Sequence, residues 1–244
     1  MKKQVLLLAL AALMWFAGAA RTAAEPAPDL VVVELFTSQG CASCPVADRI
    51  LTELAERPDV LALSLFVDYW DYLGWRDTLA RPENTKRQYA YADSLRTYAP
   101  YTPQIVIDGH IDVVGNNKSR VLWAIEDRLK RRQKPVSISF EPGADTVTVL
   151  LGDGDQVEAT VWLVRYATQT TVAINRGEND GHTFIYTDAV QSMTPIGMWN
   201  GAPARFVLPK RDLLGTDASA LGLAIIVQTE NTGLILGAAK LALQ

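Results

Sequence analysis

Residues 30–45 read LVVVELFTSQGCASCP. The apolar run from Leu30 to Phe36 is typical of a strand that is buried on both faces. From Cys44 onward, apolar side chains recur at helical spacing, and Pro45 suits the first turn of a helix, where its missing N–H costs nothing. A second apolar run, Val60–Val67, has the same buried-strand pattern. The sequence therefore predicts a strand, a cysteine motif, a helix and a second strand in succession.

Downstream of this unit, the sequence predicts a helical insertion, a β-hairpin and a closing helix. Mixed charge without strand alternation marks residues 68–99 as the insertion. The closing helix would complete an α/β domain that spans residues 25–133. These predicted elements are a helix around Arg81–Leu95, strands at 104–107 and 111–114 joined by the turn Asp108-Gly109, and a helix from Asn116 or Asn117 through Lys130.

From residue 134 the hydrophobic pattern changes from helical to alternating. Apolar residues occupy every second position in several short runs, which Pro-Gly, Gly-Asp and Asn-rich turn signals separate. Short alternating strands at this spacing are typical of a β-sandwich. The sequence therefore predicts a second, β-rich and β-sandwich-like domain over residues 134–244.

The first 24 residues have the pattern of a secretory signal peptide, with two lysines, an apolar run and then small residues that offer cleavage sites. An uncleaved anchor helix is the alternative, because the apolar run approaches membrane-spanning length. Under either interpretation we expect the folded part to lie outside the cytoplasm, in the periplasm or secreted.

The charge balance bears on the class of partner. The chain has 23 basic and 27 acidic residues, and removal of residues 1–24 would leave 20 basic and 27 acidic residues, a net charge of −7. An acidic surface argues against nucleic acid, and against a membrane after signal cleavage, as the main partner. An apolar content of 49% is ample for a packed core.

Only two cysteines occur, and they are three residues apart in the motif Cys41-Ala42-Ser43-Cys44. A disulfide that closes so short a loop constrains the unfolded chain little, so stabilisation is a weak reason for the pair. We interpret the pair as chemical, with a short structural disulfide as the alternative.

The position of Cys41 just before a predicted helix favours thiolate chemistry. Unpaired backbone N–H groups and the positive end of the helix dipole stabilise a thiolate there. The thiolate of Cys41 would attack a partner disulfide, and Cys44, one helical turn later, would displace the partner. We expect no metal site and no cofactor, because His110 and His182 are the only histidines and zinc sites need three or four ligands.

These residues resemble the thioredoxin superfamily over about residues 30–132. The resemblance rests on the cysteine motif after a buried strand and on the segment Thr102-Pro103-Gln104 before a hairpin. It implies that Pro103 is cis and faces the disulfide, and that Thr102 offers its backbone to an extended substrate. An ordinary trans proline at a strand start is the alternative.

More narrowly, nearly the whole chain after the signal peptide resembles a bacterial secreted thioredoxin-like family of unknown function. Glu34, within the first strand, lies close to where thioredoxins keep a carboxylate behind the second cysteine. A desolvated carboxylate there could relay a proton to Cys44, whereas an edge or salt-bridged glutamate is the alternative. Four aromatic residues can either line a substrate groove or serve packing: Tyr69, Trp70, Tyr72 and Trp75.

The sequence therefore favours an exported thiol-disulfide oxidoreductase that acts on protein or small-molecule disulfides. Its expected site residues are Cys41, Cys44, Pro103, Thr102 and Glu34. Its expected partners are protein thiols or disulfides and a redox partner protein. The alternative is a non-catalytic binding or assembly module on the same scaffold, and an unreactive, buried disulfide would favour it.

Overall fold

Strand β1 (Val31–Thr37) lies in the interior of the molecule, with every residue buried, as its apolar sequence predicts. The computed structural model describes residues 30–131, 133, 135–213 and 221–242, so the expected signal peptide, residues 1–24, lies outside the described residues. The other elements are α1 (Cys44–Ala55), β2 (Val60–Phe66), the 3₁₀ turn η1 (Asp71–Leu73), α2 (Pro82–Ser94), β3 (Gln104–Ile107), β4 (Ile111–Val114), α3 (Lys118–Arg131), β5 (Ile138–Pro142), β6 (Thr146–Leu151), β7 (Ala159–Ala173), β8 (Thr183–Trp199), β9 (Ala204–Pro209), α4 (Lys210–Leu213), β10 (Leu221–Thr229) and β11 (Ile235–Leu241).

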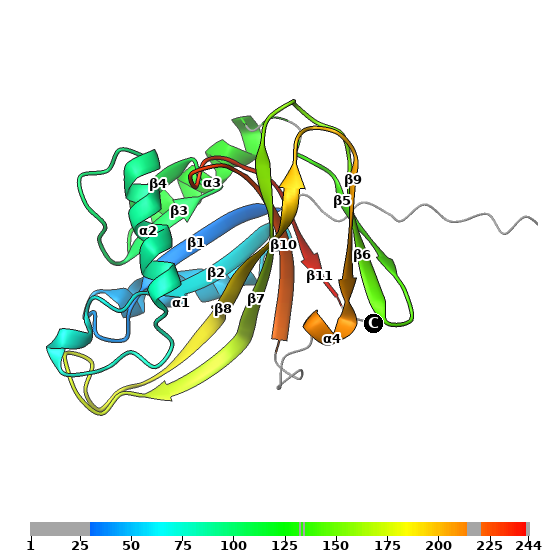
Figure 1. Ribbon diagram of the computed structural model, residues 1–244. Coiled ribbons are helices and arrows are strands. Elements are labelled where there is room, and N and C mark those ends of the chain that lie inside the picture. The colour runs from blue at the N-terminus through cyan, green and yellow to red at the C-terminus, as the bar shows by residue number, and fades with distance from the viewer. Residues whose placement is uncertain (1–29, 132, 134, 214–220, 243–244) are drawn as a thin grey trace, which may run out of the picture.

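The molecule is a mixed α/β fold built on one large mixed sheet (Figure 1). Its eight strands follow the order β11-β10-β7-β8-β2-β1-β3-β4. Strand β1 runs parallel to β2 and antiparallel to β3. Strands β5, β6 and β9 form a second, three-stranded sheet.

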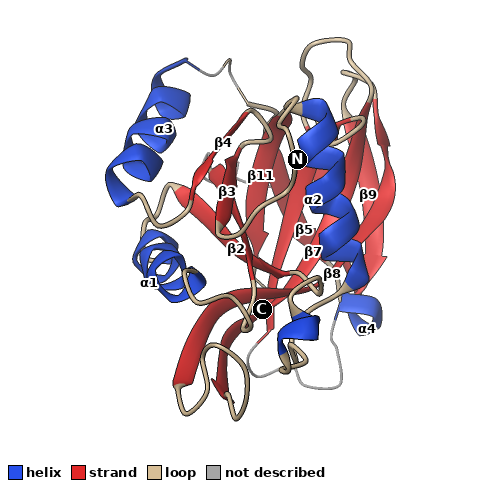
Figure 2. Ribbon diagram, turned by 90° about the vertical axis from the view of Figure 1, so that its left-hand side faces the viewer, coloured by secondary structure: helices blue, strands red, loops and turns tan. Residues whose placement is uncertain are grey.

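Helices cover both faces of the large sheet at the end that contains β1 (Figure 2). Alternate residues of β1 point to opposite faces, as strand geometry requires. Val31, Val33 and Leu35 pack with apolar residues of α1 and α3, whereas Val32 and Phe36 pack in a second cluster that includes Tyr91 of α2. A third cluster lies between the small sheet and β7, β10 and β11.

The large sheet curls, so that its two ends approach each other. The turn between β10 and β11 reaches the turn between β3 and β4, where the Ile235 N–H donates to the Asp108 carbonyl at 2.9 Å. Asp108 and Gly109 both have positive φ, 48° and 61°, as a two-residue hairpin turn of this sequence requires. The second cluster is therefore enclosed by strands from both halves of the chain.

The predicted division near residue 134 does not interrupt the large sheet. Strand β8, from the β-rich half, pairs in parallel with β2, and the Ser64 hydroxyl donates to the Thr187 carbonyl at 2.8 Å. The physical reason is that β2 would otherwise be an exposed apolar edge strand, which an additional strand covers. The expectation of a separate β-sandwich after residue 133 is therefore revised to one shared sheet with a small second sheet.

Several local predictions agree with the structure. Strands β3 and β4 have the predicted bounds, and α2 and α3 fall within one residue of the predicted helices. Asn117 serves as the predicted N-cap of α3, since its side-chain oxygen accepts the Arg120 N–H at 3.1 Å. Within the described residues, the helices are too short or too polar to cross a lipid bilayer.

Candidate functional site

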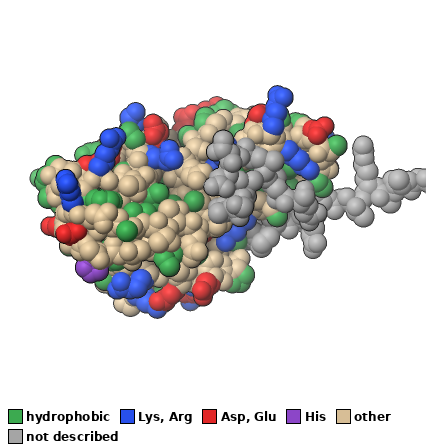
Figure 3. Space-filling view, turned by 90° about the horizontal axis from the view of Figure 1, so that it is seen from below, with side chains coloured by type: hydrophobic (Ala, Val, Ile, Leu, Met, Phe, Trp, Pro, Cys, Tyr) green, Lys and Arg blue, Asp and Glu red, His purple; other side chains and the backbone are tan. Residues whose placement is uncertain are grey.

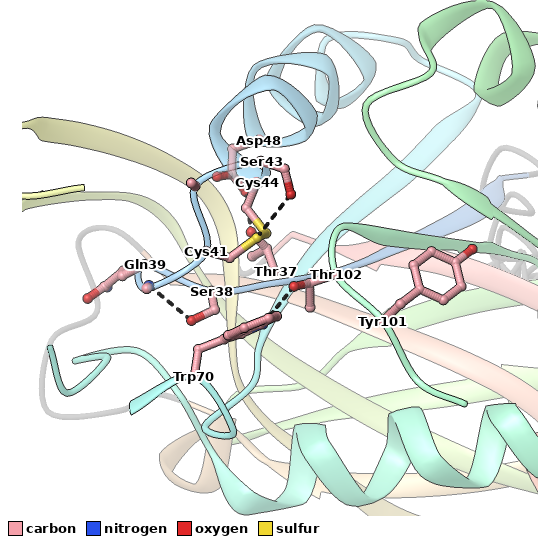
Figure 4. The surroundings of a disulfide bond; sticks show 12 residues. Thr37, Ser38, Gln39, Cys41, Ser43, Cys44, Asp48, Trp70, Tyr101 and Thr102 are labelled. Carbon is pink, nitrogen blue, oxygen red and sulfur yellow. Dashed lines mark hydrogen bonds between the residues drawn. A yellow bond between two sulfur atoms is a disulfide. The ribbon is translucent and has the colours of Figure 1, made fainter. Parts of the chain in front are cut away.

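Cys41 and Cys44 are joined by a disulfide at the point where β1 gives way to α1 (Figure 4). Residues 38–43, here called the cysteine loop, connect the two elements. Cys41 is 3% exposed and Cys44 is 0% exposed, whereas Ala42 and Ser43 between them are exposed. The Ser43 hydroxyl lies 3.4 Å from the sulfur of Cys41. The sulfur atoms therefore lie just beneath an exposed turn.

Trp70 connects the cysteine loop to the segment before β3. Its indole N–H donates to the Thr102 hydroxyl at 2.8 Å (Figure 4). Its Cβ lies so close to Gly40 that an added Cβ at Gly40 would be only 3.2 Å away. Glycine before Cys41 thus gives space for Trp70, which brings the Thr102 side chain towards the cysteine loop.

Pro103, before β3, and Ala47, in the first turn of α1, both border Gly115. An added Cβ at Gly115 would lie 3.2 Å from the Cβ of Pro103 and 3.1 Å from that of Ala47, so these residues meet at one point. The Thr102–Pro103 peptide bond is cis, as the resemblance implies. The structure therefore brings Cys41, Cys44, Thr102 and Pro103 together.

Asp48 lies on α1 one turn after Cys44 and on the same face of the helix. The Thr37 hydroxyl donates to its carboxylate at 2.8 Å. The pKa of Asp48 is raised to about 7, chiefly by loss of hydration on burial and also by the nearby Asp77 carboxylate, against the lowering effects of the Thr37 hydrogen bond and Arg49. A carboxyl group with a pKa near neutrality can accept and return a proton. Asp48 is thus the acid–base candidate beside the cysteines.

Asp77, in the segment before α2, is hydrogen-bonded to the cysteine loop. Its buried carboxylate accepts the backbone N–H of Gln39 at 2.7 Å, together with the N–H groups of Leu79 and Ala80. Burial raises the pKa of Asp77 to about 6 against the lowering effect of these three donors. The Trp75 indole N–H also donates to the Gln39 side chain, at 2.8 Å. This segment therefore fixes the position of the loop.

The turn between β7 and β8 reaches the cysteine loop from the distant β-rich half. The buried side-chain amide of Asn179 donates to the carbonyl oxygens of Gln39 at 2.8 Å and Cys41 at 3.1 Å. The Glu178 carboxylate accepts the Ala42 N–H at 3.2 Å. The β-rich half thus supplies part of the site.

Glu34 does not lie beside Cys44, which corrects the expectation that it relays protons there. On β1 it shares the face of Val32 and Phe36, opposite to the face that α1 covers. Its fully buried carboxylate pairs with Arg87 of α2 at 2.6 Å and also accepts the Tyr91 hydroxyl. Glu34 is therefore part of a buried ion pair, the alternative that the sequence left open.

The aromatic residues have divided roles. Trp70 and Trp75 are hydrogen-bonded to Thr102 and Gln39, so they position the site. Tyr72 is 76% exposed, and its ring stacks on Trp70 with centroids 6.2 Å apart. Trp70 and Trp75 therefore have a structural role at the site, whereas Tyr72 lies at the surface.

Sequence reasoning missed Asp48, Asp77, Glu178 and Asn179. The position of Asp48, four residues after Cys44, was a usable signal, because residues so spaced share a helix face. Glu178 and Asn179 follow Cys41 by more than 130 residues, and no local pattern links them to the cysteine loop. The structure shows no group of three or more potential metal-ligating side chains within the described ranges.

A family model described as a protein of unknown function, DUF1223, matches residues 32–228, a range that includes every site residue described above. No curated protein matches the chain. The crystal structure of a structural genomics target protein from Agrobacterium tumefaciens is 34% identical to the chain with a TM-score of 0.77, over 89% of this chain and 96% of that one. HBP35 of Porphyromonas gingivalis is 14% identical with a TM-score of 0.58, over 88% of this chain and 76% of that one, and shows similarity of fold alone.

Proposed function

Since the chain belongs to the DUF1223 family, which is defined without a stated activity, we propose a function from its own site: thiol–disulfide exchange through Cys41 and Cys44. The observation that carries this proposal is the position of the pair. It lies at the N-terminus of the 12-residue helix α1, with Asp48 one turn beyond Cys44 and with Pro103 and Ala47 of α1 both bordering Gly115. The expected export signal supports action in the periplasm or after secretion.

The order of elements around the pair supports a thioredoxin-like interpretation of the first half. Strands β2, β1, β3 and β4 are neighbours in that order, with β1 and β2 parallel and β3 and β4 antiparallel. Helices α1 and α3 cover one face of these strands and α2 the other. The β7–β8 turn is an addition to such a domain, and we propose that it belongs to the catalytic unit.

In the proposed reaction, the Cys41 thiolate attacks one sulfur of a partner disulfide. A bond forms between Cys41 and that sulfur, and the partner's other sulfur leaves as a thiolate and takes up a proton. Cys44 then gives its proton to Asp48 and attacks the Cys41 sulfur, which releases the partner as a dithiol. Two electrons pass from the protein to the partner, and the same steps in reverse oxidise a partner dithiol.

Two features of the site support these roles. The positive end of the α1 dipole, at the helix N-terminus beside Cys41, favours a thiolate over a thiol. Asp48 can take the Cys44 proton near neutral pH because burial raises its pKa to about 7. Thr102 is half-buried and hydrogen-bonded to Trp70, and in the proposed reaction its backbone would contact an extended segment of the partner, with the buried Pro103 beside it.

The binding or assembly module remains the second candidate, and the 3% exposure of Cys41 is the observation that favours it. A disulfide that no thiol can reach would have a structural role only. The two candidates differ in one measurable property, which is the rate of exchange between the native protein and glutathione.

The test uses the exported chain in its native state. We expect reduced glutathione to open the Cys41–Cys44 disulfide without denaturant, and Cys44→Ser to accumulate mixed disulfides through Cys41 in periplasmic extracts. Cys41→Ser, the matched control, is expected to trap nothing. Non-reducing electrophoresis and mass spectrometry give the readout. If the disulfide of the native protein resists glutathione but exchanges once the protein is unfolded, the module interpretation is correct and exchange catalysis is not.

A further inference from the structure

Two carboxylates accept N–H groups of the cysteine loop, and a third lies one helical turn after Cys44. Asp77 accepts the Gln39 N–H, Glu178 accepts the Ala42 N–H, and Asp48 lies beyond Cys44. Within the described residues, no lysine or arginine side chain hydrogen-bonds to the loop. The basic side chains nearest in sequence to these carboxylates are exposed: Arg49, Arg76 and Arg176. On the face drawn in Figure 3, acidic and basic side chains are interspersed.

Two N–H groups beside Cys41 that could stabilise a thiolate there already have acceptors. The Cys44 N–H donates to the Cys41 carbonyl at 3.2 Å. The Ala42 N–H, next along the chain from Cys41, donates to the Glu178 carboxylate at 3.2 Å. A carboxylate at this position both occupies a donor and repels a negative sulfur.

We infer that Glu178 is a positioning residue that keeps the reduction potential of the Cys41–Cys44 pair low, so that the dithiol form reduces disulfides in exported partner proteins. The inference deepens the proposed exchange activity and rests on it. A disulfide becomes a strong oxidant when its reduced form is stabilised as a thiolate. Glu178 acts against that stabilisation, and the pair therefore gives up its two electrons readily.

The electron balance defines the partners by class. Each cycle converts the dithiol to the Cys41–Cys44 disulfide and one partner disulfide to two thiols. A second protein dithiol, of still lower potential, must return two electrons by the same exchange. Asn179 positions Glu178 next to the cysteine loop. Its buried side-chain amide donates to two carbonyl oxygens of the loop and so attaches the β7–β8 turn to it.

The experiment measures the equilibrium of the pair with glutathione for the wild type, Glu178→Gln and Glu178→Ala. Glutamine keeps an oxygen acceptor for the Ala42 N–H and removes only the charge. We expect Glu178→Gln to shift the equilibrium towards the dithiol by about three- to tenfold, which corresponds to about 15–30 mV. Alkylation of reduced protein across pH should show a lowered pKa for Cys41. Asp180→Asn, which removes a charge from the same turn without a bond to the loop, is the matched control and should shift the equilibrium less.

The outcomes separate the inference from the proposed function. If the pair exchanges with glutathione but Glu178→Gln leaves the potential unchanged, or raises the Cys41 pKa, the role of Glu178 is refuted while exchange stands. If neither the wild type nor the variants exchange, the proposed function itself fails. Glu178 is exposed, so both variants should fold, and circular dichroism checks this. A wild-type potential as high as that of a strong protein oxidant, about −120 mV, would also overturn the inference.

Discussion

At the scale of single residues, the carboxylate near Cys44 is that of Asp48, one helical turn after it, whereas Glu34, which we expected there from the sequence, lies on the other face of β1. Strand β1 is apolar on both faces, so its pattern does not reveal whether Glu34 faces α1 or α2. Asp48 was readable from its helical spacing to Cys44, whereas its burial depends on packing against Thr37 and its surroundings. Helical spacing from Cys44 was therefore a better guide to which carboxylate lies near the cysteines than the apolar pattern of β1.

Asp48→Asn is expected to stabilise the protein above pH 7. Because burial raises the pKa of Asp48 from 3.8 to about 7, the folded state binds a proton that the unfolded state releases between these values. Stability therefore falls as pH rises from about 4 to 7, and the full penalty applies above 7. With allowance for partial exposure, asparagine should recover about 1–2 kcal/mol at pH 8 and little at pH 4.

Urea unfolding at several pH values measures this difference. The same variant should resolve mixed disulfides more slowly than the wild type, and its rate should lose the inflection near pH 7. A variant that is both less stable at pH 8 and unchanged in its pH–rate profile would contradict the assignment of Asp48 as acid–base group.

Glu34→Ala is expected to lower stability by about 3–5 kcal/mol, because it leaves the Arg87 guanidinium buried without its partner. The double variant Glu34→Leu with Arg87→Met should regain most of that loss. Chemical unfolding gives both values. Neither change should move the reduction potential, since Glu34 lies on the face of β1 that is opposite to α1. A shift in potential in the folded double variant would restore Glu34 as a functional residue.

At the scale of elements, the sequence predicted strands and helices well but did not predict what the turns contact. Alternation indicated the positions of β5, β6 and the first part of β7, and turn residues located the hairpin at Asp108 and Gly109. Alternation did not locate β8 to β11 individually, and β7 and β8 are long strands of 15 and 17 residues rather than short ones. The contact of the β7–β8 turn with the cysteine loop depends on how two long strands extend past the sheet, and this is a tertiary property (Figure 1).

Asn179→Ala is expected to loosen the cysteine loop. The change leaves the Gln39 carbonyl without the Asn179 donor and the Cys41 carbonyl with the Cys44 N–H alone, which costs about 1–3 kcal/mol. Hydrogen exchange should show reduced protection of the loop amides, while the amides of β3 and β4 serve as the internal reference. Unchanged protection of the loop amides would show that the Asn179 hydrogen bonds do not stabilise the cysteine loop. Asn179→Asp should be worse, because a carboxylate cannot donate to these carbonyls.

At the scale of the whole molecule, the mixed α/β architecture was predictable from the sequence. That strands from both halves of the chain form one sheet was not. Each half has its own hydrophobic period, and the change near residue 134 favoured a domain boundary. The sheet nevertheless continues from β2 to β8, because apolar β2 has a free edge in the first half alone. The hydrophobic period of a sequence shows which face of a strand is buried. It does not show which other strand pairs with that strand's edge.

A chain limited to residues 27–133 is therefore expected to fold poorly and to lack normal exchange. The cluster on the α2 side of the sheet includes residues from both halves, and removal of the second half would expose its apolar face to water. The residues lost from this cluster are Val164, Tyr166, Val190, Ala224, Ile226, Ile235 and Ala238. The fragment would also lose the Asn179 and Glu178 contacts with the cysteine loop.

Size-exclusion chromatography, circular dichroism and binding of a hydrophobic dye measure the state of this fragment beside the full chain. We expect aggregation or a loosely packed state with strong dye binding. A monomeric fragment that unfolds cooperatively would show that the first half is an independent domain. If such a fragment also exchanged with glutathione but at a higher potential than the full chain, the β-rich half would be a tuning element for the cysteine pair, because the fragment lacks the Glu178 carboxylate.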